Sequence, residues 1–362
     1  MLKRTFAISV VLVSLAFLIE SQQASRSRKS RRSSTTAQRA KRKPPPVTTF
    51  ATDTGGPELI VRILDVGQGD AIYIRNGNSK VLIDGGPQEA TLGRYLDSLR
   101  LNSSTIDAVI LTHQHLDHYS GLQELFKTKR HIHVRYFFEN KDPAPALTLA
   151  HLRDSILSRM DHDGLVYRDT DDPCSDGRRI CTITMTGGAK LHILAPKPDG
   201  DGPNNRSAAV KLIGRDSASF TMWLAGDAEQ EEISWFEQAG YTENPGMHVN
   251  VLKADHHGSC NGVTQHYLSL IQPQWLVTSV GARNEYGHMH AQAKDIYRAA
   301  GIPWYRTDQN GAITIRSPGI GNGGYTIVPV RSGTDLSGPS DRISHQFDCT
   351  EDLNKGQPAP RS

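Results

Sequence analysis

The chain has 362 residues, which is enough for one large domain with terminal extensions or for two domains. Its formal net charge is +3, but residues 1–50 hold 11 of the 41 Lys and Arg residues and only one acid. The rest therefore carries 30 basic against 37 acidic residues, so the pI of about 8.6 does not indicate a basic, nucleic-acid-binding body.

The N-terminus reads MLKRTFAISVVLVSLAFLIESQQAS, with two basic residues, an apolar run and then small polar residues. This is the layout of a secretory signal, and the apolar run is short for a membrane span. Residues 1–24 are therefore expected to be a signal peptide that sends the protein out of the cytoplasm, to the periplasm or beyond. A short uncleaved anchor is the alternative, because the basic stretch that follows would resist translocation. No other segment predicts a membrane span.

Residues 25–56 are polar, basic and interrupted by proline, which predicts a disordered linker. The alternative is a basic arm that contacts nucleic acid or another anionic surface. Residues 57–331 are expected to form the folded domain, and residues 332–362 a polar C-terminal tail.

Four cysteines suit an oxidising compartment. Cys174 and Cys181 bracket the turn-like PCSDGRRIC and predict one disulfide, and Cys260 with Cys349 is a candidate second pair. In a cytoplasmic protein all four would instead be free thiols.

The folded domain alternates expected strands and helices. The first strands are ELIVRILDV, the AIYIRNGNSKVLIDGG hairpin turning at Asn76-Gly77, DAVILTH and YFFEN, with helices near 89–99 and 147–160. Next come the hairpins TITMTGGAKLHIL and AAVKLIG with SFTMWLAGD, followed by the helix AEQEEISWFEQAG. The last strands are VNVLKADHHG, QWLVTSVG and AITIRS, with helices near 264–271 and 291–300. This mixture favours a layered α/β sandwich over a purely parallel sheet.

Polar residues follow several of these strands. Asp84 ends KVLIDGG, His113 begins HQHLDH after DAVILT, Asp227 ends FTMWLAGD, and His256-His257 follows VLKAD. Each alone has an ordinary explanation, such as a hydrogen-bonded histidine, a capping aspartate or a surface pair. Together they predict a metal site, because converging histidine and aspartate side chains suit zinc or manganese.

HQHLDH also matches the HxHxDH signature of the metallo-β-lactamase superfamily. More narrowly, the chain resembles the metallo-β-lactamase domain of ComEC-type DNA-internalisation competence proteins and their free-standing relatives. The resemblance covers about residues 58–316 and rests on an ordered series of segments: LDVGQGDA, LIDGG, LTHQHLDHYSGL, NNRSAAVKL, LAGD, LKADHHGS, SVGARNEYGHMH and YRTDQNGAI. It implies an α/β fold, a four-layer αββα sandwich with mixed sheets, and a centre of two Zn²⁺ ions, with Mn²⁺ as the alternative.

The resemblance also implies a ligand set: His113 and His115 for a first metal, Asp117, His118 and His257 for a second, and Asp227 as the bridge. His257 is preferred to His256 because a histidine directly before glycine matches the superfamily pattern. His256 would support the site or contact substrate, and Asp84 would order the ligand loop.

One segment departs from the superfamily pattern. Many members have a further metal-binding histidine between the first cluster and the bridging aspartate, and NNRSAAV stands at that place here. Asn205 and Ser207 would position substrate or support the first metal through water. A single-metal enzyme is therefore an alternative. The other histidines in this interval lack a convincing context: His131, His133, His151, His162 and His192.

The implied activity is hydrolysis, in which a metal-activated water attacks a phosphodiester. The substrate would be DNA or a small phosphodiester such as a nucleotide or a phosphocholine ester. Asp117 would orient the water, and His288 or His290 would protonate the leaving group or bind phosphate. The candidate phosphate contacts are Lys253, Arg206, Arg283 and Arg306. The alternatives are a hydrolase of an ester, lactone or β-lactam and a non-catalytic DNA-capture module.

Overall fold

The computed structural model describes residues 58–331, apart from 145, 216–219, 283 and 319–323. The predicted signal or anchor segment, the linker and the C-terminal tail lie outside the described residues, as does Cys349 of the second candidate disulfide. The first predicted disulfide is confirmed, since Cys174 and Cys181 are bonded. Among the helices of the described part, none is both long and apolar enough to cross a membrane.

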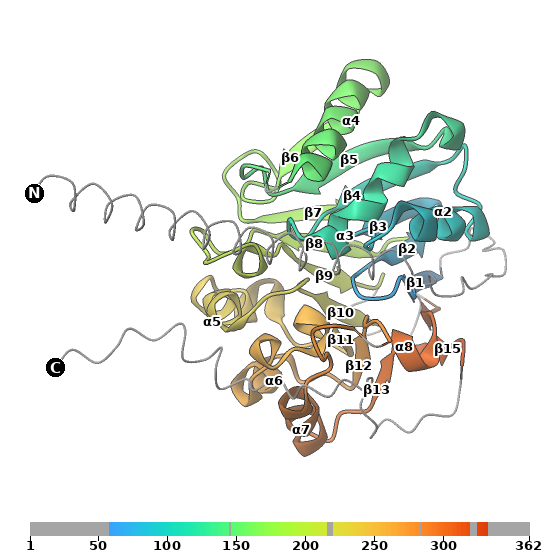
Figure 1. Cartoon of the computed structure of the whole chain (residues 1–362). Coiled ribbons are helices and arrows are strands. Elements are labelled where there is room, and N and C mark those ends of the chain that lie inside the picture. The colour runs from blue at the N-terminus through green and yellow to red at the C-terminus, as the bar shows by residue number, and fades with distance from the viewer. Residues whose placement is uncertain (1–57, 145, 216–219, 283, 319–323, 332–362) are drawn as a thin grey trace, which may run out of the picture. The chain divides into compact units, whose positions relative to one another are not determined.

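Two mixed β-sheets form the centre of the domain (Figure 1). The first has the order β15-β14-β1-β2-β3-β4-β5-β6, with strands β1 (Leu59–Ile63), β2 (Ile72–Asn76), β3 (Ser79–Ile83), β4 (Thr105–Ile110), β5 (His133–Glu139), β6 (Val166–Asp169), β14 (Ile313–Ser317) and β15 (Thr326–Pro329). The second has the order β13-β12-β11-β10-β9-β8-β7, with strands β7 (Ile180–Thr184), β8 (Lys190–Leu194), β9 (Ala209–Ile213), β10 (Thr221–Leu224), β11 (Val251–Lys253), β12 (Trp275–Thr278) and β13 (Trp304–Arg306).

Each sheet joins antiparallel hairpins to a run of parallel strands. In the first sheet β1 to β3 are antiparallel and β3 to β6 are parallel. In the second, β7 to β10 are antiparallel and β10 to β13 are parallel. The predicted Asn76-Gly77 turn joins β2 to β3, and Gly77 has the positive φ of 62° that such a short turn requires.

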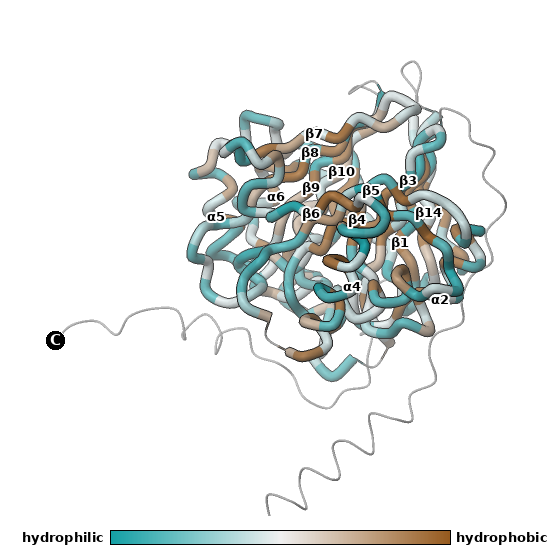
Figure 2. The backbone as a smooth tube through the Cα atoms, turned by 90° about the horizontal axis from the view of Figure 1, so that it is seen from above, coloured by the Kyte–Doolittle hydropathy of each residue, from teal (hydrophilic) through white to brown (hydrophobic). Residues whose placement is uncertain are grey.

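Helices cover the outer face of each sheet. The helices α2 (Glu89–Ser98) and α4 (Leu147–Asp163) pack on the first sheet, and α5 (Gln230–Gln238), α6 (Gln265–Ile271) and α7 (Ala291–Ala299) pack on the second. Along β3, Val81 and Ile83 face the core between the sheets, whereas Leu82 faces the helices. In Figure 2 the strands are brown in the interior and the surrounding loops are mostly teal. The predicted αββα sandwich with mixed sheets is confirmed.

The expected helices are present, with ends that differ by a few residues. Three short strands, β6, β13 and β15, were not expected from the sequence. β13 has only three residues, and β15 lies at the sheet edge with alternating exposure. Neither β13 nor β15 therefore has the apolar run that is typical of a buried strand.

The fold brings strand ends from both sheets together. β3 and β4 are parallel neighbours, and they end shortly before Asp84 and His113. β10 and β11 are parallel neighbours in the other sheet, and they lead to Asp227 and to the His256-His257 pair. The carboxyl ends of parallel strands share one sheet edge, so residues distant in sequence meet there.

Candidate metal centre

The HQHLDH segment follows β4, begins the short helix α3 (Leu116–Tyr119) and is held by Asp84. Asp84 is fully buried and has a positive φ of 57°. Its carboxylate accepts hydrogen bonds of 2.8 Å from the backbone N–H and the hydroxyl of Thr112 and from His118 Nδ1. Asp84 therefore fixes the ring of His118 in one orientation, as the implied loop-ordering role requires.

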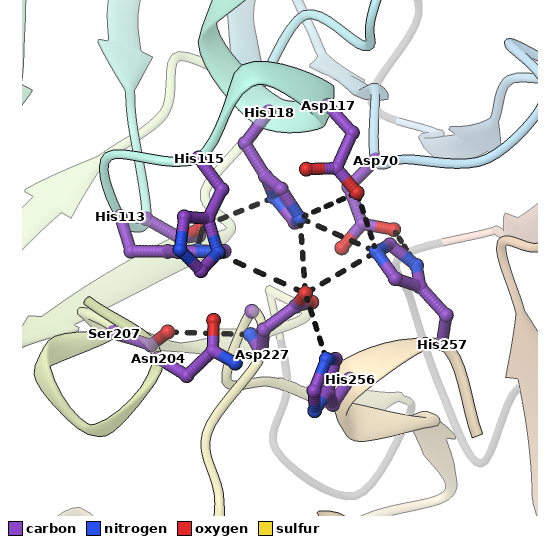
Figure 3. Close-up of polar contacts among 12 residues, drawn as sticks. Asp70, His113, His115, Asp117, His118, Asn204, Ser207, Asp227, His256 and His257 are labelled. Atoms are coloured by element: carbon purple, nitrogen blue, oxygen red, sulfur yellow. Dashed lines mark hydrogen bonds and ion pairs between the residues drawn. The ribbon is translucent and has the colours of Figure 1, made fainter. Parts of the chain in front are cut away.

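Four potential ligands converge beside this loop (Figure 3): Asp117, His118, Asp227 and His257, whose ligand atoms all lie within 4.8 Å of one another. Asp227 Oδ2 lies 3.3 Å from both His118 Nε2 and His257 Nε2. Asp117 Oδ2 lies 3.4 Å from His257 Nε2. Two carboxylates with two imidazoles form a donor set suited to zinc or manganese.

The ring protons of these histidines face away from the cluster. His257 Nδ1 lies 2.9 Å from the backbone oxygen of Ser279, and His118 Nδ1 faces Asp84. Because both partners are acceptors, Nδ1 carries the proton of each neutral ring. The two Nε2 lone pairs therefore face each other 3.3 Å apart, next to Asp227 Oδ2. Such lone pairs repel unless a cation lies between them, so these residues fit a divalent metal ion.

Protons replace that cation when no metal is bound. Burial alone would lower the pKa of His257, but the carboxylates of Asp227 and Asp117 raise this pKa to about 9. Burial also opposes protonation of His118, yet Asp227 and Asp84 raise its pKa well above the ordinary value. The pKa of Asp227 is held well below its usual range, because His257 and His118 outweigh the effect of burial. A metal ion would compete with these protons for the same lone pairs.

His113 and His115 lie on another side of the Asp227 carboxylate (Figure 3). His113 Nε2 is 3.1 Å from His115 Nδ1 and 3.9 Å from Asp227 Oδ2. The Thr112 hydroxyl donates to Asp84, so it accepts from His113 Nδ1 at 3.2 Å and leaves the lone pair on His113 Nε2. Four of the six predicted ligands thus form one cluster, and His113 and His115 adjoin it through Asp227 and through each other.

Asp70 is a part of the site to which the sequence analysis gave no role. The buried Lys253 Nζ lies 2.5 Å from Asp70 Oδ2 and 3.7 Å from Asp227 Oδ1, and it donates to the Gly226 carbonyl at 2.9 Å. Asp70 Oδ1 lies 3.6 Å from His257 Nδ1. Lys253 therefore compensates two buried carboxylates and does not reach the surface to meet a phosphate. The sequence feature that could have indicated a role for Asp70 is its position in the LDVGQGDA turn, before β2.

The NNRS segment, with the short helix η3 (Asn204–Arg206), supports the backbone near Asp227. Ser207 Oγ accepts from Asp227 N at 3.2 Å, and Ser207 N donates to the buried Glu232 at 2.9 Å. The Asn205 amide donates to the Asp201 carbonyl and accepts from Glu232 N. Ser207 thus supports the site, whereas the Asn205 side chain connects its own loop to helix α5.

The two histidines of GHMH differ in their surroundings. The His288 Nδ1 atom lies 3.3 Å from Gln68 Nε2, and since the Gln68 oxygen accepts a backbone N–H, the amide donates to His288. The ring proton of His288 is therefore on Nε2. Burial and neighbouring histidines lower the pKa of His288 well below its ordinary value, which keeps the ring neutral.

His290 contacts the protein through both ring nitrogens. The Nδ1 atom accepts from Cys260 N at 3.1 Å, and the Nε2 atom lies 3.0 Å from the Tyr286 carbonyl. This geometry supports a loop-holding role for His290 and speaks against the expected proton transfer.

Two of the other candidate phosphate contacts are paired with carboxylates. Arg206 lies 2.7 Å from Asp171, and the buried Arg306 lies 2.8 Å from Asp308. Arg283 lies outside the described residues. Neither paired arginine presents an uncompensated charge to a nucleic-acid backbone.

The family model of the metallo-beta-lactamase superfamily matches residues 64–143, which include the HQHLDH segment, so this part of the chain is similar to that superfamily. The solved metallo-beta-lactamase fold protein YhfI from Bacillus subtilis aligns with a TM-score of 0.43 and 13% identity over 69% of this chain and 96% of that chain.

Curated relatives narrow the comparison. The chain is 25% identical over 302 residues to ComE operon protein 3 of Bacillus subtilis (strain 168), a match covering 76% of this chain and 35% of that protein. It is 24% identical over 277 residues to Competence protein ComA of Neisseria gonorrhoeae, covering 76% of this chain and 34% of that protein. The predicted resemblance to ComEC-type competence proteins is confirmed, and the chain spans about a third of the length of these relatives.

Proposed function

We propose that this protein is a metal-dependent hydrolase that cleaves a phosphodiester. The observation that carries the proposal is the meeting of imidazole nitrogens and carboxylate oxygens around Asp227 Oδ2, with candidate ligand atoms on more than one side. Bound divalent ions, Zn²⁺ or Mn²⁺, would supply Lewis-acid polarisation and a water of lowered pKa, and two such ions suit the attacking and leaving oxygens of an in-line displacement.

Asp117 is the member of the cluster that faces solvent. Its side chain is 26% exposed, whereas those of Asp227 and His257 are 3% and 1% exposed. Although burial opposes ionisation, His118 and His257 lower the pKa of Asp117 below its ordinary value, so this carboxylate stays ionised. Asp117 is therefore placed to accept a hydrogen bond from an entering water and to orient it.

His288 has a different part in the proposal. A neutral ring with its proton on Nε2 and a strongly lowered pKa is a weak acid but a good hydrogen-bond donor. We assign His288 to binding a substrate oxygen, and we do not assign leaving-group protonation to it.

The charges around the site favour a small substrate. Lys253 is buried between carboxylates, and Arg206 and Arg306 are each paired with an aspartate. Binding of a long nucleic acid draws on many cationic contacts to phosphate. A small phosphodiester, such as a nucleotide or a phosphocholine ester, is therefore proposed ahead of single-stranded DNA.

The test is a substrate panel on metal-free protein reloaded with Zn²⁺ or Mn²⁺. The substrates are bis-p-nitrophenyl phosphate, a phosphocholine ester, single-stranded DNA and the β-lactam nitrocefin. Asp227→Ala removes the shared carboxylate and should lower the rate by at least about 100-fold. Asp199→Asn, a change in a surface turn, is the matched control and should keep the rate.

Two results would overturn the proposal: no phosphodiester cleaved with either metal, or equal rates for Asp227→Ala and the unchanged protein. Cleavage of nitrocefin alone would favour the alternative β-lactam hydrolase, and DNA as the preferred substrate would reverse the proposed order. An extracytoplasmic location is proposed as well, supported by the Cys174–Cys181 disulfide. A mature protein that keeps Met1 would contradict signal cleavage.

A further inference from the structure

The two groups of candidate ligands around Asp227 contain different numbers of residues. Asp117, His118, Asp227 and His257 make four candidate ligands on one side. His113 and His115 have only Asp227 as a third partner. In the NNRS segment, where many superfamily members have a histidine, the Asn205 and Ser207 side chains bind the protein itself, whereas the buried Oδ1 of Asn204 has no hydrogen-bond partner among the described residues.

We propose that His256 supplies the fourth ligand of the first metal, together with His113, His115 and Asp227. The inference rests on the proposed metal-dependent function and assigns a role to the first histidine of DHHG, which was expected to support the site or contact substrate. His256 Nε2 lies 3.9 Å from Asp227 Oδ2, the same separation as between His113 Nε2 and that oxygen. Figure 3 shows its ring turned toward the Asp227 carboxylate.

The backbone turns both adjacent histidines into the site. Side chains of neighbouring residues in an extended segment point to opposite sides. Here His256 and His257, in the short helix η5 (Asp255–Gly258), have φ values of 45° and 54°, so both are in the left-handed region. Residues other than glycine rarely adopt this region, because it strains their backbone. This strain is explained if both rings are needed at Asp227, where His257 Nε2 lies 3.3 Å from Oδ2.

The far nitrogen of His256 is held in the same manner as those of the other ligands. His256 Nδ1 lies 3.0 Å from Asn261 Oδ1 and 3.3 Å from Glu229 Oε1. Both atoms are acceptors if the amide is oriented as described, so Nδ1 carries the proton and the Nε2 lone pair faces Asp227. Carboxylates commonly hold metal-binding histidines in this way.

The NNRS segment takes part indirectly. Asn204 Nδ2 donates to Glu229 Oε1 at 2.6 Å, and Glu229 in turn faces His256. Asn204, in the segment without the usual histidine, therefore positions the Glu229 carboxylate, and this carboxylate positions His256. In the proposed ligand set, the fourth ligand of the first metal therefore comes from the region after Asp227.

Metal binding without substrate tests this assignment. Metal-free protein is titrated with Zn²⁺ against a chromophoric chelator, and Co²⁺ loading is followed by visible absorption. The unchanged protein should bind two ions. His256→Ala should keep one ion at unchanged affinity and bind the other at least tenfold more weakly, with a changed Co²⁺ spectrum. Added imidazole should restore part of the lost affinity.

Two further variants separate ligation from structural damage. Glu229→Gln removes no proposed ligand and should weaken the same ion by roughly tenfold. His266→Ala, whose exposed ring contacts Glu237 on the surface, should bind both ions as the unchanged protein does. A circular-dichroism melt establishes that each variant is folded; if His256→Ala is not, Glu229→Gln decides.

The assignment is overturned if His256→Ala binds two ions with unchanged affinities, or if the unchanged protein binds only one. It is also overturned if His256→Ala fails to fold and Glu229→Gln binds both ions normally. Because the titration contains no substrate, a protein that cleaves none of the panel can still bind two ions. Failure of the proposed hydrolysis and failure of this assignment are therefore distinguishable.

Discussion

At the scale of single residues, the site depends on the buried ammonium group of Lys253. Burial alone would lower the pKa of Lys253, but the carboxylates of Asp70 and Asp227 raise it above the ordinary value. The lysine is therefore charged, and it is the partner that makes two buried carboxylates tolerable beside the histidines. Its bond to the Gly226 carbonyl also fixes the turn that carries Asp227.

Lys253→Met should destabilise the metal-free protein by about 3–5 kcal/mol, because the change leaves carboxylates buried without their partner. The measurement is the free energy of unfolding in urea. Lys211→Met is the matched control: Lys211 is also buried, but its Nζ contacts the carbonyl oxygens of Pro245 and His248, and burial lowers its pKa. Its loss should be smaller, about 1–2 kcal/mol. Equal losses for both variants would contradict the charge argument.

The sequence indicated the candidate ligands more clearly than the residues that support them. Histidine and aspartate are recognisable as metal-binding residue types in the sequence. They occur in HQHLDH, at Asp227 and in the DHHG pair, and each of these groups follows an apolar strand. The Asp70–Lys253 pair could not be predicted, because it forms only once the β1–β2 turn meets the end of β11. The burial of Lys253, which argues against its expected phosphate contact, likewise could not be predicted from the short segment VLK.

At the scale of elements, the loop from β1 to β2 carries a buried carboxyl, Asp65, outside the ligand set. Burial raises the pKa of Asp65 to about 6, against the opposing effects of Arg331 and the Gly67 N–H. Tyr95 on α2 binds the backbone of the same residue through its hydroxyl. This loop thus combines a firm contact to a helix with an unfavourable buried charge at neutral pH.

The Asp65→Asn variant tests the free-energy cost of ionising the buried Asp65 carboxyl. The test is the pH dependence of the free energy of unfolding. A carboxyl whose pKa is raised on folding favours the folded state while it is protonated. Its contribution is present below the unfolded pKa of 3.8 and is lost as the pH rises through about 6. Between pH 4 and 7 the unchanged protein should therefore lose up to about 3 kcal/mol relative to Asp65→Asn. Urea unfolding of both proteins in chelator measures the difference, and parallel pH profiles would contradict it.

The sequence predicted some strands and turns correctly and missed others. The hairpin turning at Asn76-Gly77 and the strand DAVILTH were clear from turn chemistry and from a continuous apolar run. β13 and β15 were missed because pairing with neighbours in the sheet, and not their own pattern, makes them strands. The order of strands within each sheet also depends on packing between distant segments, such as β1 with β14.

At the scale of the whole domain, the proposed ligands come from loops of both sheets. The HQHLDH ligands follow β4 of the first sheet, whereas Asp227 and His257 follow β10 and β11 of the second. A metal ion bound as proposed would contact loops of both sheets and would bind the folded chain more tightly than the unfolded chain. Metal binding should therefore stabilise the entire domain, and not one loop alone.

Removing metal should lower the thermal midpoint of unfolding. For an ion present at 100 times its dissociation constant, the lost stabilisation is about 2.7 kcal/mol, which corresponds to roughly 5–10 °C for a domain of this size. Hydrogen exchange should speed up on chelation in both the HQHLDH loop and the DHHG loop, because each loses a shared partner. Asp227→Ala, which lacks the residue common to both ligand groups, should show a much smaller shift. A midpoint that is unchanged by chelation, or faster exchange in one sheet only, would show that the site does not connect the two sheets.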